Sequence, residues 1–358
     1  MALISLAVRG FRNLQPVTVE FVPGGNYLFG PNGAGKTNLL EAIHYLAIGR
    51  SFRNCADTDM VGFSEDVLAV AGSDSAGRRG EIRFDRREKR VALDGTRVER
   101  LSDYLGWLSV VAVLLDDIEL VRGGPALRRG FLDMAIAKSD RGYIPVLAAY
   151  RRVLAQRNQL LERGVADGQL GAWDDQLVRA GVAVYAHRSA VVGRLLEDAA
   201  AFSGRLAGEP ARFVYAPSVD IDGDPATAFV VRLAATRARS LELGQTLVGP
   251  HRDDIRIRCG ERDLRRFGSV GEQRLAGIAL RLAEAELLAG CGGSPTFLLD
   301  EVASELDERR SRLLFELVEE RGQVIYVAAR RLAHGSGRTG AKEFHVETGE
   351  VHEVPPAE

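Results

Sequence analysis

The sequence predicts an α/β protein that combines a lobe of mixed β-sheet, a lobe with a parallel sheet, and a mainly helical second domain. Three observations predict this fold. A complete G-x-x-x-x-G-K-[ST] pattern at residues 30–37 joins a short apolar run to a helical pattern. A second apolar run, at 296–299, ends in two acids. Between them, residues 125–207 have the apolar spacing of long amphipathic helices.

The composition is that of a globular chain, with 358 residues of which 46% are hydrophobic. No apolar run approaches the roughly 18 residues of a membrane span, so we expect a cytoplasmic protein without membrane contact. The three cysteines, Cys55, Cys259 and Cys291, are far apart and favour neither a disulfide framework nor a zinc site. A net charge of -2 argues against a dedicated nucleic-acid module but is compatible with a local basic patch.

The glycine-rich loop has the flanks that a phosphate-binding loop requires. Tyr27–Phe29 is a short apolar strand, preceded by two alternating runs at 3–11 and 17–22, and helical apolar spacing follows from Leu39 to Ala47. Backbone N–H groups and the positive end of the helix dipole then meet an anion. We expect phosphate binding by Gly30, Pro31, Asn32, Gly33, Ala34, Gly35, Lys36 and Thr37.

The apolar pattern in the middle of the chain changes from that of short strands to that of long helices. Residues 63–113 predict short strands and turns, including a charged run, Arg83–Arg90, that we interpret as a solvated face, with nucleic-acid contact as the less favoured alternative. Residues 125–207 predict helices of about 30 residues, hence about 45 Å long. Two apolar stripes mark them: Leu147, Tyr150, Leu154 and Leu161, then Leu177, Val184, Val192 and Leu196.

A loop-rich stretch containing Pro217 and Pro225 is expected next, and strand-like texture from Gly244 to Ile257. We therefore place one domain at 1–124 and 240–358, built from both ends of the chain. A mainly helical arm domain at 125–239 is inserted into it.

The acids after the apolar run 296–299 form a second half-site. A buried strand end holds Asp300 at a fixed distance from the phosphates, where it coordinates Mg²⁺ together with the Thr37 hydroxyl. Glu301 then orients or deprotonates the attacking water, with Lys36 as its catalytic partner. The alternative is a strand that ends in solvated acids.

The pattern S-x-G-E at 269–272 begins a helix whose apolar stripe contains Leu275, Ile278 and Leu282 and which ends near Gly290. By itself this pattern is typical of an N-cap with a capping-box acid. Ser269, Gly271 and the free helix N–H groups also make an anion site. Together with the loop at 30–37, the chain then has two anion sites for one nucleotide.

This combination resembles the ABC-type ATPases, in which the S-x-G-E signature of one subunit closes on the γ-phosphate held by another. The resemblance implies ATP and Mg²⁺ as cofactors and an ATP-driven homodimer. Ser304–Asp307 resembles the D-loop of that superfamily. The run 323–329 lacks the histidine that transporter ATPases have there, which implies slow hydrolysis.

Four further motifs resemble the bacterial RecF family, in the SMC/Rad50-like branch: Phe11–Asn13, Gly49–Arg53, Pro125–Asp133 and Gly249–Asp254. The resemblance implies that Arg12 and Asn13 contact the nucleotide. It also implies a weak, DNA-dependent ATPase that binds duplex DNA and gap junctions and helps to load RecA together with RecR and RecO. The predicted helices are too short for the long coiled-coil tether of SMC proteins.

Several alternatives remain open at this point. His251, Asp253 and Asp254 form either a metal cluster or, as we favour, a hydrogen-bonded turn. Arg128 and Arg129 either contact DNA, which is slightly favoured, or cover a helix with their stems. A nucleotide-gated protein scaffold and a small-molecule kinase are the alternative functions; the kinase would need no S-x-G-E element.

Overall fold

The computed structural model describes residues 2–164, 170–331 and 340–355 and divides into two compact units. The first unit is Met1–Asp117 with Glu284–Glu358, and the second is Ile118–Ala283. The first contains two six-stranded sheets and the second a three-stranded sheet with the long helices. The predicted α/β fold is confirmed. The expected domains 1–124 with 240–358 and 125–239 stay a proposal, distinct from these units.

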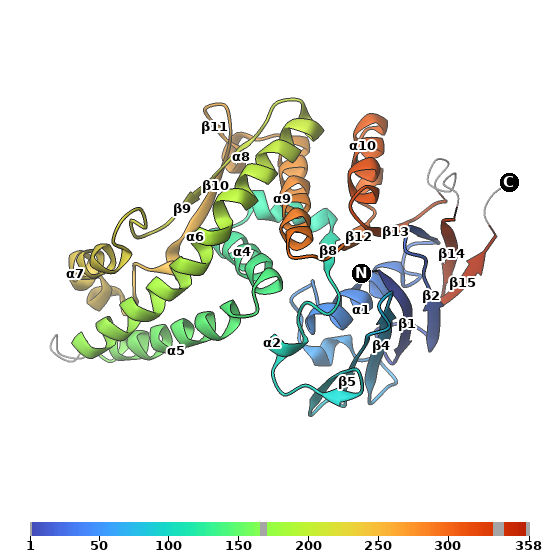
Figure 1. Cartoon of the computed structure of the whole chain (residues 1–358), viewed down its shortest axis with the longest axis horizontal. Coiled ribbons are helices and arrows are strands. Elements are labelled where there is room, and N and C mark those ends of the chain that lie inside the picture. The colour runs from blue at the N-terminus through green and yellow to red at the C-terminus, as the bar shows by residue number, and fades with distance from the viewer. Residues whose placement is uncertain (1, 165–169, 332–339, 356–358) are drawn as a thin grey trace. The chain divides into compact units, whose positions relative to one another are not determined.

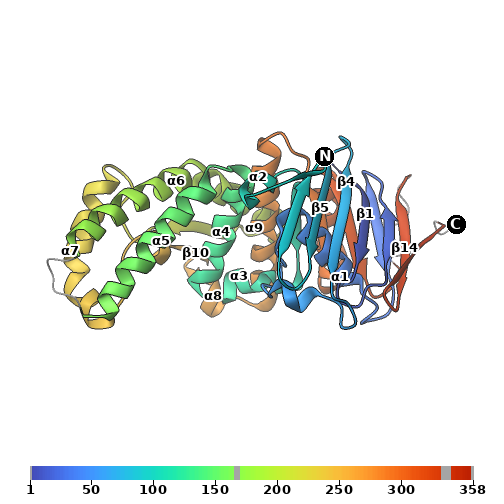
Figure 2. The ribbon, with the colours of Figure 1, turned by 90° about the horizontal axis from the view of Figure 1, so that it is seen from below.

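The first sheet is antiparallel, with the strand order β2-β1-β4-β5-β6-β7. Figure 2 shows β1, β4 and β5 side by side. Alternate residues of β4 are buried, so one face of this sheet packs on the core of the unit. The strands are β1 (Leu3–Arg9), β2 (Val17–Glu20), β4 (Leu68–Asp74), β5 (Arg79–Phe84), β6 (Lys89–Leu93) and β7 (Thr96–Arg97).

The second sheet has the order β15-β14-β3-β13-β12-β8 and is parallel except for β15, which pairs with β14 in red in Figure 1. Ala328 of β13 lies opposite Phe29 of β3, and Val327 lies opposite Asp300 of β12. The carboxyl ends of these three strands therefore share one edge. The strands are β3 (Gly25–Phe29), β8 (Val110–Val113), β12 (Thr296–Asp300), β13 (Gln323–Ala328), β14 (Lys342–Glu347) and β15 (Glu350–Val354).

Helix α1 (Lys36–Ile48) contacts strands of both sheets, and residues all round it are buried. The apolar stripe expected from Leu39 to Ala47 is thus confirmed. Helix α10 (Glu308–Glu319) packs on β13, where the rings of Phe315 and Tyr326 meet edge to face at 5.1 Å. Short elements complete the unit: α2 (Leu101–Tyr104), η1 (Asp57–Met60), η2 (Leu115–Ile118) and η5 (Val302–Glu305).

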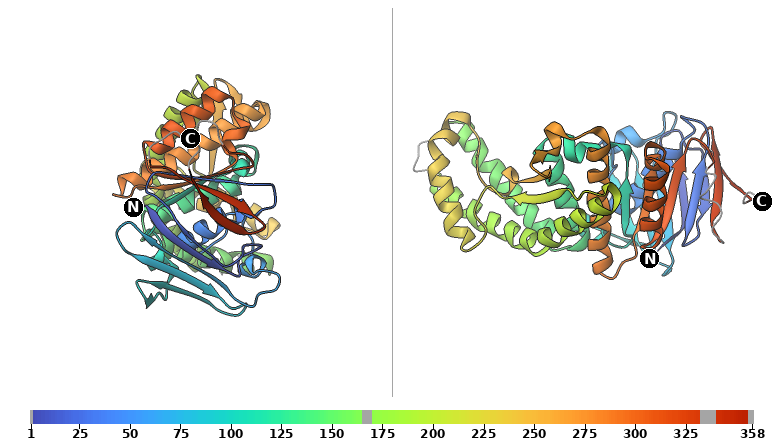
Figure 3. Two further views of the ribbon diagram at one scale, coloured as in Figure 1. Left: turned by 90° about the vertical axis from the view of Figure 1, so that its right-hand side faces the viewer. Right: turned by 90° about the horizontal axis from the view of Figure 1, so that it is seen from above.

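The second unit contains most of the long helices. Figure 3 shows α7 in gold against the green α5 and α6, which it contacts. Helix α6 has 37 residues and is about 55 Å long, longer than expected. The helices are α3 (Glu119–Arg122), α4 (Pro125–Ser139), α5 (Tyr143–Glu162), α6 (Gly171–Ala207), α7 (Pro225–Leu243), α8 (Leu264–Phe267) and α9 (Val270–Gly290), whose last residues belong to the first unit. The sheet order is β11-β10-β9, from β9 (Arg212–Ala216), β10 (Asp254–Cys259) and β11 (Arg262–Asp263), with η4 at Pro250–Arg252.

The expected loop around Pro217 and Pro225 is wrong, because β9 and α7 occupy much of it. Asp224 accepts a hydrogen bond from the Ala226 N–H, and Pro225 is the first helical residue. Pro fits this position because its missing N–H would have no helical partner there. The expected strand texture from Gly244 is also too early, since β10 begins at Asp254.

The two predicted apolar stripes differ in outcome. All four residues on α6, Leu177, Val184, Val192 and Leu196, are buried. On α5, Tyr150 and Leu161 are buried, whereas Leu147 and Leu154 are half-buried. Within the described ranges, no helix has both the length and the apolar character needed to span a membrane.

Candidate nucleotide-binding site

The loop between β3 and α1 depends on its glycines. A Cβ on Gly30 would lie 2.0 Å from the carbonyl oxygen of Val346, so the chain can pass β14 only without a side chain there. Gly35 precedes α1 with φ 113°, a left-handed conformation that favours glycine. No side chain caps α1 and its first turn has no acid, so the positive helix end is open to an anion. The loop therefore fits a phosphate group.

Lys36 is nearly buried, with 5% of its side chain exposed. Its Nζ donates hydrogen bonds to the carbonyl oxygens of Gly30 at 2.8 Å and Pro31 at 3.0 Å, and lies 3.7 Å from Glu301 Oε1. The Lys36 side chain thus folds back so that its ammonium group contacts the start of the loop. Neutral carbonyl partners are weaker than charged ones, so a phosphate oxygen can replace them.

Thr37 and Asp300 meet although 263 residues separate them, since the Thr37 Oγ1 donates to Asp300 Oδ1 at 3.0 Å. Burial raises the pKa of Asp300, and the hydrogen bond from Thr37 partly opposes that shift. A hydroxyl and a carboxylate held this close provide two of the oxygen ligands that Mg²⁺ prefers. The parallel pairing of β3, β13 and β12 brings the two residues to one edge.

Glu301 has an unusual backbone conformation. Its φ is 51°, in the left-handed region that costs a non-glycine residue free energy. The Glu301 N–H donates to the Val327 carbonyl at 3.0 Å, and the Glu301 carbonyl accepts a hydrogen bond from the Ser304 hydroxyl at 2.6 Å. These bonds hold the half-exposed Glu301 carboxylate beside Lys36. No sequence pattern predicted this conformation.

Arg12 and Asn13 have different surroundings. The Arg12 Nε and one Nη donate to both oxygens of the fully buried Glu41, at 2.9 and 2.8 Å, and its other Nη donates to the Asp59 carbonyl. The bond to Glu41 raises the pKa of Arg12. Asn13 instead donates to the Gly33 carbonyl at 3.0 Å. In this conformation Asn13 supports the phosphate loop, while Arg12 is engaged by protein groups.

Glu41 is a buried acid whose role was not predicted from the sequence. Ser51 and Arg53 donate hydrogen bonds to it, at 2.5 and 2.9 Å, in addition to Arg12. Arg53 is the most exposed of the three and also bonds the Asn38 side chain at 2.9 Å. An acid inside the apolar run LLEAI was the available signal, because a buried carboxylate requires partners.

Ser269 and Gly271 are exposed at the beginning of α9, in the second unit, so the structure places them in a different unit from the loop. The Glu272 N–H donates to Ser269 Oγ at 3.2 Å, and the Ser269 N–H donates to Glu272 Oε2 at 2.7 Å. These reciprocal bonds are a capping box and lower the pKa of Glu272. Phe267 and Val270, which flank Ser269, are 64% and 50% exposed.

The turn at Gly249–Asp254 is built from hydrogen bonds. His251 Nδ1 lies 2.6 Å from the Tyr150 hydroxyl, and Nε2 lies 3.0 Å from the Thr246 carbonyl. Burial lowers the pKa of His251 from 6.5 to about 4. No cluster of three or more His, Cys, Asp or Glu side chains suited to a metal occurs in the part of the chain that the structure describes. The metal alternative therefore has no support.

Asp253 is the buried centre of this turn, with 0% exposed. It accepts hydrogen bonds from the Tyr185 hydroxyl at 3.1 Å, the Ser218 N–H at 2.8 Å and Arg188 Nη1 at 2.6 Å. Arg188 also pairs with Asp133 at 2.8 Å. One buried arginine thus joins two acids from different elements.

The preference for Arg128 as a DNA contact is wrong. Arg128 is 3% exposed, pairs with Asp254 at 2.7 Å and donates to the Gly123 carbonyl at 2.8 Å. Its guanidinium group therefore binds protein groups and is not available to DNA. Arg129 is half-buried and donates to the Asp253 carbonyl at 2.9 Å.

Comparisons with known proteins agree with this geometry. The family model described as the RecF/RecN/SMC N terminal domain matches residues 2–349. Proteins named DNA replication and repair protein RecF are similar: one from Moorella thermoacetica is 40% identical, covering 89% of this chain and 87% of that protein. Another, from Chloroflexus aggregans, is 37% identical, covering 98% and 99%.

Solved structures are also similar. One is described as the recombination mediator protein RecF with ATP in the RecFOR pathway; it is 29% identical with a TM-score of 0.89, covering 99% of this chain and 98% of that one. An SMC head bound to the C-terminal winged-helix domain of ScpA has a TM-score of 0.58 at 16% identity, and that likeness shows the fold alone.

We predict that Arg188→Met strongly destabilises the chain, because it leaves Asp253 buried without its cation and Asp133 with the exposed Arg151 as its ion-pair partner. Removing one partner of a buried pair typically costs about 3–5 kcal/mol. The matched control is Arg194→Met on the same helix, where the side chain is 68% exposed and should contribute less than about 1 kcal/mol. Urea denaturation measures both, and equal effects would contradict the role of Arg188.

We predict that His251 makes the free energy of unfolding depend on pH between about 4 and 6.5. In that window the unfolded chain binds a proton that the folded chain rejects, so His251 lowers stability as pH falls. Above pH 6.5 this histidine is neutral in both the folded and the unfolded chain, so it no longer changes the free energy of unfolding. His251→Gln should flatten this part of the pH profile in denaturation experiments. Parallel wild-type and variant profiles would show that His251 titrates normally.

Proposed function

Because this chain belongs to the RecF/RecN/SMC family, and within it to the RecF proteins, we propose that it is an ATP-dependent DNA-binding protein of recombinational DNA repair. One observation carries the proposal. Lys36, Thr37, Asp300 and Glu301 come from two distant parts of the sequence and meet at one sheet edge through a 3.0 Å hydrogen bond and a 3.7 Å ion pair.

The residues present fit ATP with Mg²⁺. The open helix end and Lys36 bind phosphate oxygens, and Thr37 with Asp300 holds the cation. Bound Mg²⁺ supplies charge neutralisation at the phosphates. Glu301 orients the attacking water and accepts its proton. Nucleotide binding by Gly30–Thr37 and Asn13, and hydrolysis through Glu301, are therefore our assignment; Arg12 would first have to leave Glu41.

We further propose that ATP closes a homodimer. Ser269 and Gly271 are exposed at a helix N-terminus, where a phosphate would be bound well. The apolar side chains of Phe267 and Val270 beside them are exposed in the single chain. Closure on the loop of a second copy would cover these side chains and complete the terminal-phosphate site. Slow hydrolysis would then act as a timer for opening.

The DNA and protein partners are proposed from the relatives. Those proteins are named for DNA replication and repair, and one solved relative is described as part of the RecFOR pathway. We propose binding to duplex DNA near single-strand gaps and gap junctions, with RecR and RecO as partners in loading RecA, in the cytoplasm. The ATPase would be weak and DNA-dependent.

A nucleotide-gated protein scaffold is the second candidate, favoured by the net charge of -2. The salt dependence of binding distinguishes the scaffold from the DNA-binding protein. DNA binding weakens steeply as salt rises, because phosphate contacts release counterions, whereas association with a protein need not. A small-molecule kinase would give no DNA binding at any salt concentration.

We predict a shift from monomer to dimer when ATP and Mg²⁺ are added, strengthened by gapped DNA. Glu301→Gln should bind ATP and accumulate as the dimer, because water activation is lost while the phosphate site stays intact. Lys36→Ala should lose ATP binding. Light scattering after size-exclusion chromatography measures the masses.

Ser269→Arg is the informative control. It should bind ATP as a monomer and fail to dimerise, because the arginine blocks the exposed helix end. Normal dimerisation of this variant would refute the two-chain site. Monomers under every condition, including Glu301→Gln with ATP and gapped DNA, would refute the clamp itself.

A further inference from the structure

The carboxyl end of β13 has two polar side chains without a partner among the described residues, the Arg330 guanidinium and the Tyr326 hydroxyl. Tyr326 is 1% exposed, and burial together with the charges of Glu301 and Asp300 raises its pKa, so it stays a protonated hydroxyl near those acids. Arg330 is exposed. A buried hydroxyl without a protein partner indicates a place where a ligand or water completes the hydrogen bonding, and the exposed Arg330 guanidinium is open to an anion.

The strand register fixes where Arg330 emerges. Ala328 lies opposite Phe29, the residue before the glycine loop, and Val327 lies opposite Asp300. Arg330 follows two residues after Ala328. Its backbone therefore leaves the sheet at the edge where the phosphate loop lies on one side and the acids on the other.

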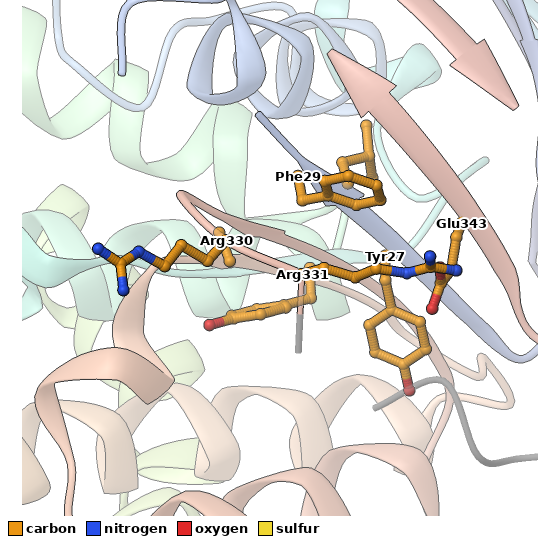
Figure 4. Close-up of a pocket in the computed structure, with 8 residues that line it drawn as sticks. Tyr27, Phe29, Arg330, Arg331 and Glu343 are labelled. Carbon is orange, nitrogen blue, oxygen red and sulfur yellow. The ribbon is translucent and has the colours of Figure 1, made fainter. Parts of the chain in front are cut away.

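The side chains of Arg330 and Arg331 point in opposite directions. Arg331 passes over the Phe29 ring, 5.6 Å from its centroid, and forms an ion pair with Glu343 of β14. Figure 4 shows the Arg330 guanidinium pointing the opposite way. In the strand order β14-β3-β13-β12, the direction away from β14 leads toward β12 and its acids.

We propose that Arg330 binds the terminal phosphate of the nucleotide and thereby distinguishes a triphosphate from a diphosphate. This inference rests on the proposed nucleotide binding. Lys36 approaches the phosphates from inside the loop, whereas Arg330 approaches from the end of the central strand. A guanidinium suits this role because it stays charged and binds phosphate oxygens in pairs. It also offsets the charge of Glu301 when a phosphate lies beside that acid.

The test is an equilibrium titration of the full chain with ATP and with ADP, each with Mg²⁺, read by displacement of a fluorescent nucleotide. Arg330→Ala should weaken ATP binding roughly 10- to 100-fold, the effect of losing a charged hydrogen bond, and change ADP binding less than about threefold. Arg330→Lys should recover part of the ATP affinity. Arg87→Ala, an exposed arginine at the β5–β6 turn, is the matched control and should change neither.

The outcomes separate the hypotheses. Equal weakening of ATP and ADP, or no weakening, in Arg330→Ala would overturn the assignment while leaving the proposed function intact. If wild-type protein binds neither nucleotide, the proposed function itself fails. A third arm adds inorganic phosphate to ADP. If free phosphate binds through Arg330 as tightly as ATP does, the site is one for free phosphate, and the assignment to the nucleotide is refuted.

Discussion

Everything at the candidate site depends on the pairing of β13 with β3 on one side and β12 on the other. These three strands are parallel and their ends align, so the glycine loop and the acid pair meet although 263 residues separate Thr37 from Asp300. A shift of one residue in either pairing would turn alternate side chains to the other face of the sheet. The site is therefore a property of the register.

Two kinds of polar contact occur in this chain. Glu41 and Arg188 are buried with several charged or hydroxyl partners, and losing all of these contacts would leave a charge unpaired in the interior. The Lys36 ammonium group and the Ser269 hydroxyl instead form hydrogen bonds with neutral backbone groups, and Lys36 Nζ also lies 3.7 Å from Glu301. Those contacts can be exchanged for phosphate oxygens at little cost, since the polar groups remain satisfied. The arrangement separates the residues that hold the fold from those available to a ligand.

The sequence predicted the parts that local patterns encode. The glycine loop, the strand that ends in acids and the capping box each have a fixed spacing of residue types. The spacing of the apolar residues around them indicates whether each lies next to a strand or a helix. It failed where long-range contacts decide the outcome. Arg128 was assigned to a DNA-contacting surface from the sequence, yet it is buried and pairs with Asp254, 126 residues away. Helix α7 was missed because Pro225 was assigned to a loop-rich stretch, although the preceding Asp224 caps a helix there. The left-handed Glu301 has no sequence signature.

The strain at Glu301 connects the two ends of the site. Its N–H is held by the Val327 carbonyl, so the position of the proposed water-activating carboxylate depends on β13. Arg330 lies two residues beyond the end of the same strand. A phosphate bound by Arg330 would pull on the end of β13, and the Val327 carbonyl would transmit that displacement directly to Glu301. A strained conformation persists only while its surroundings enforce it. One hydrogen bond thus connects the backbone of Glu301 to the end of β13, beyond which we propose that Arg330 binds a phosphate.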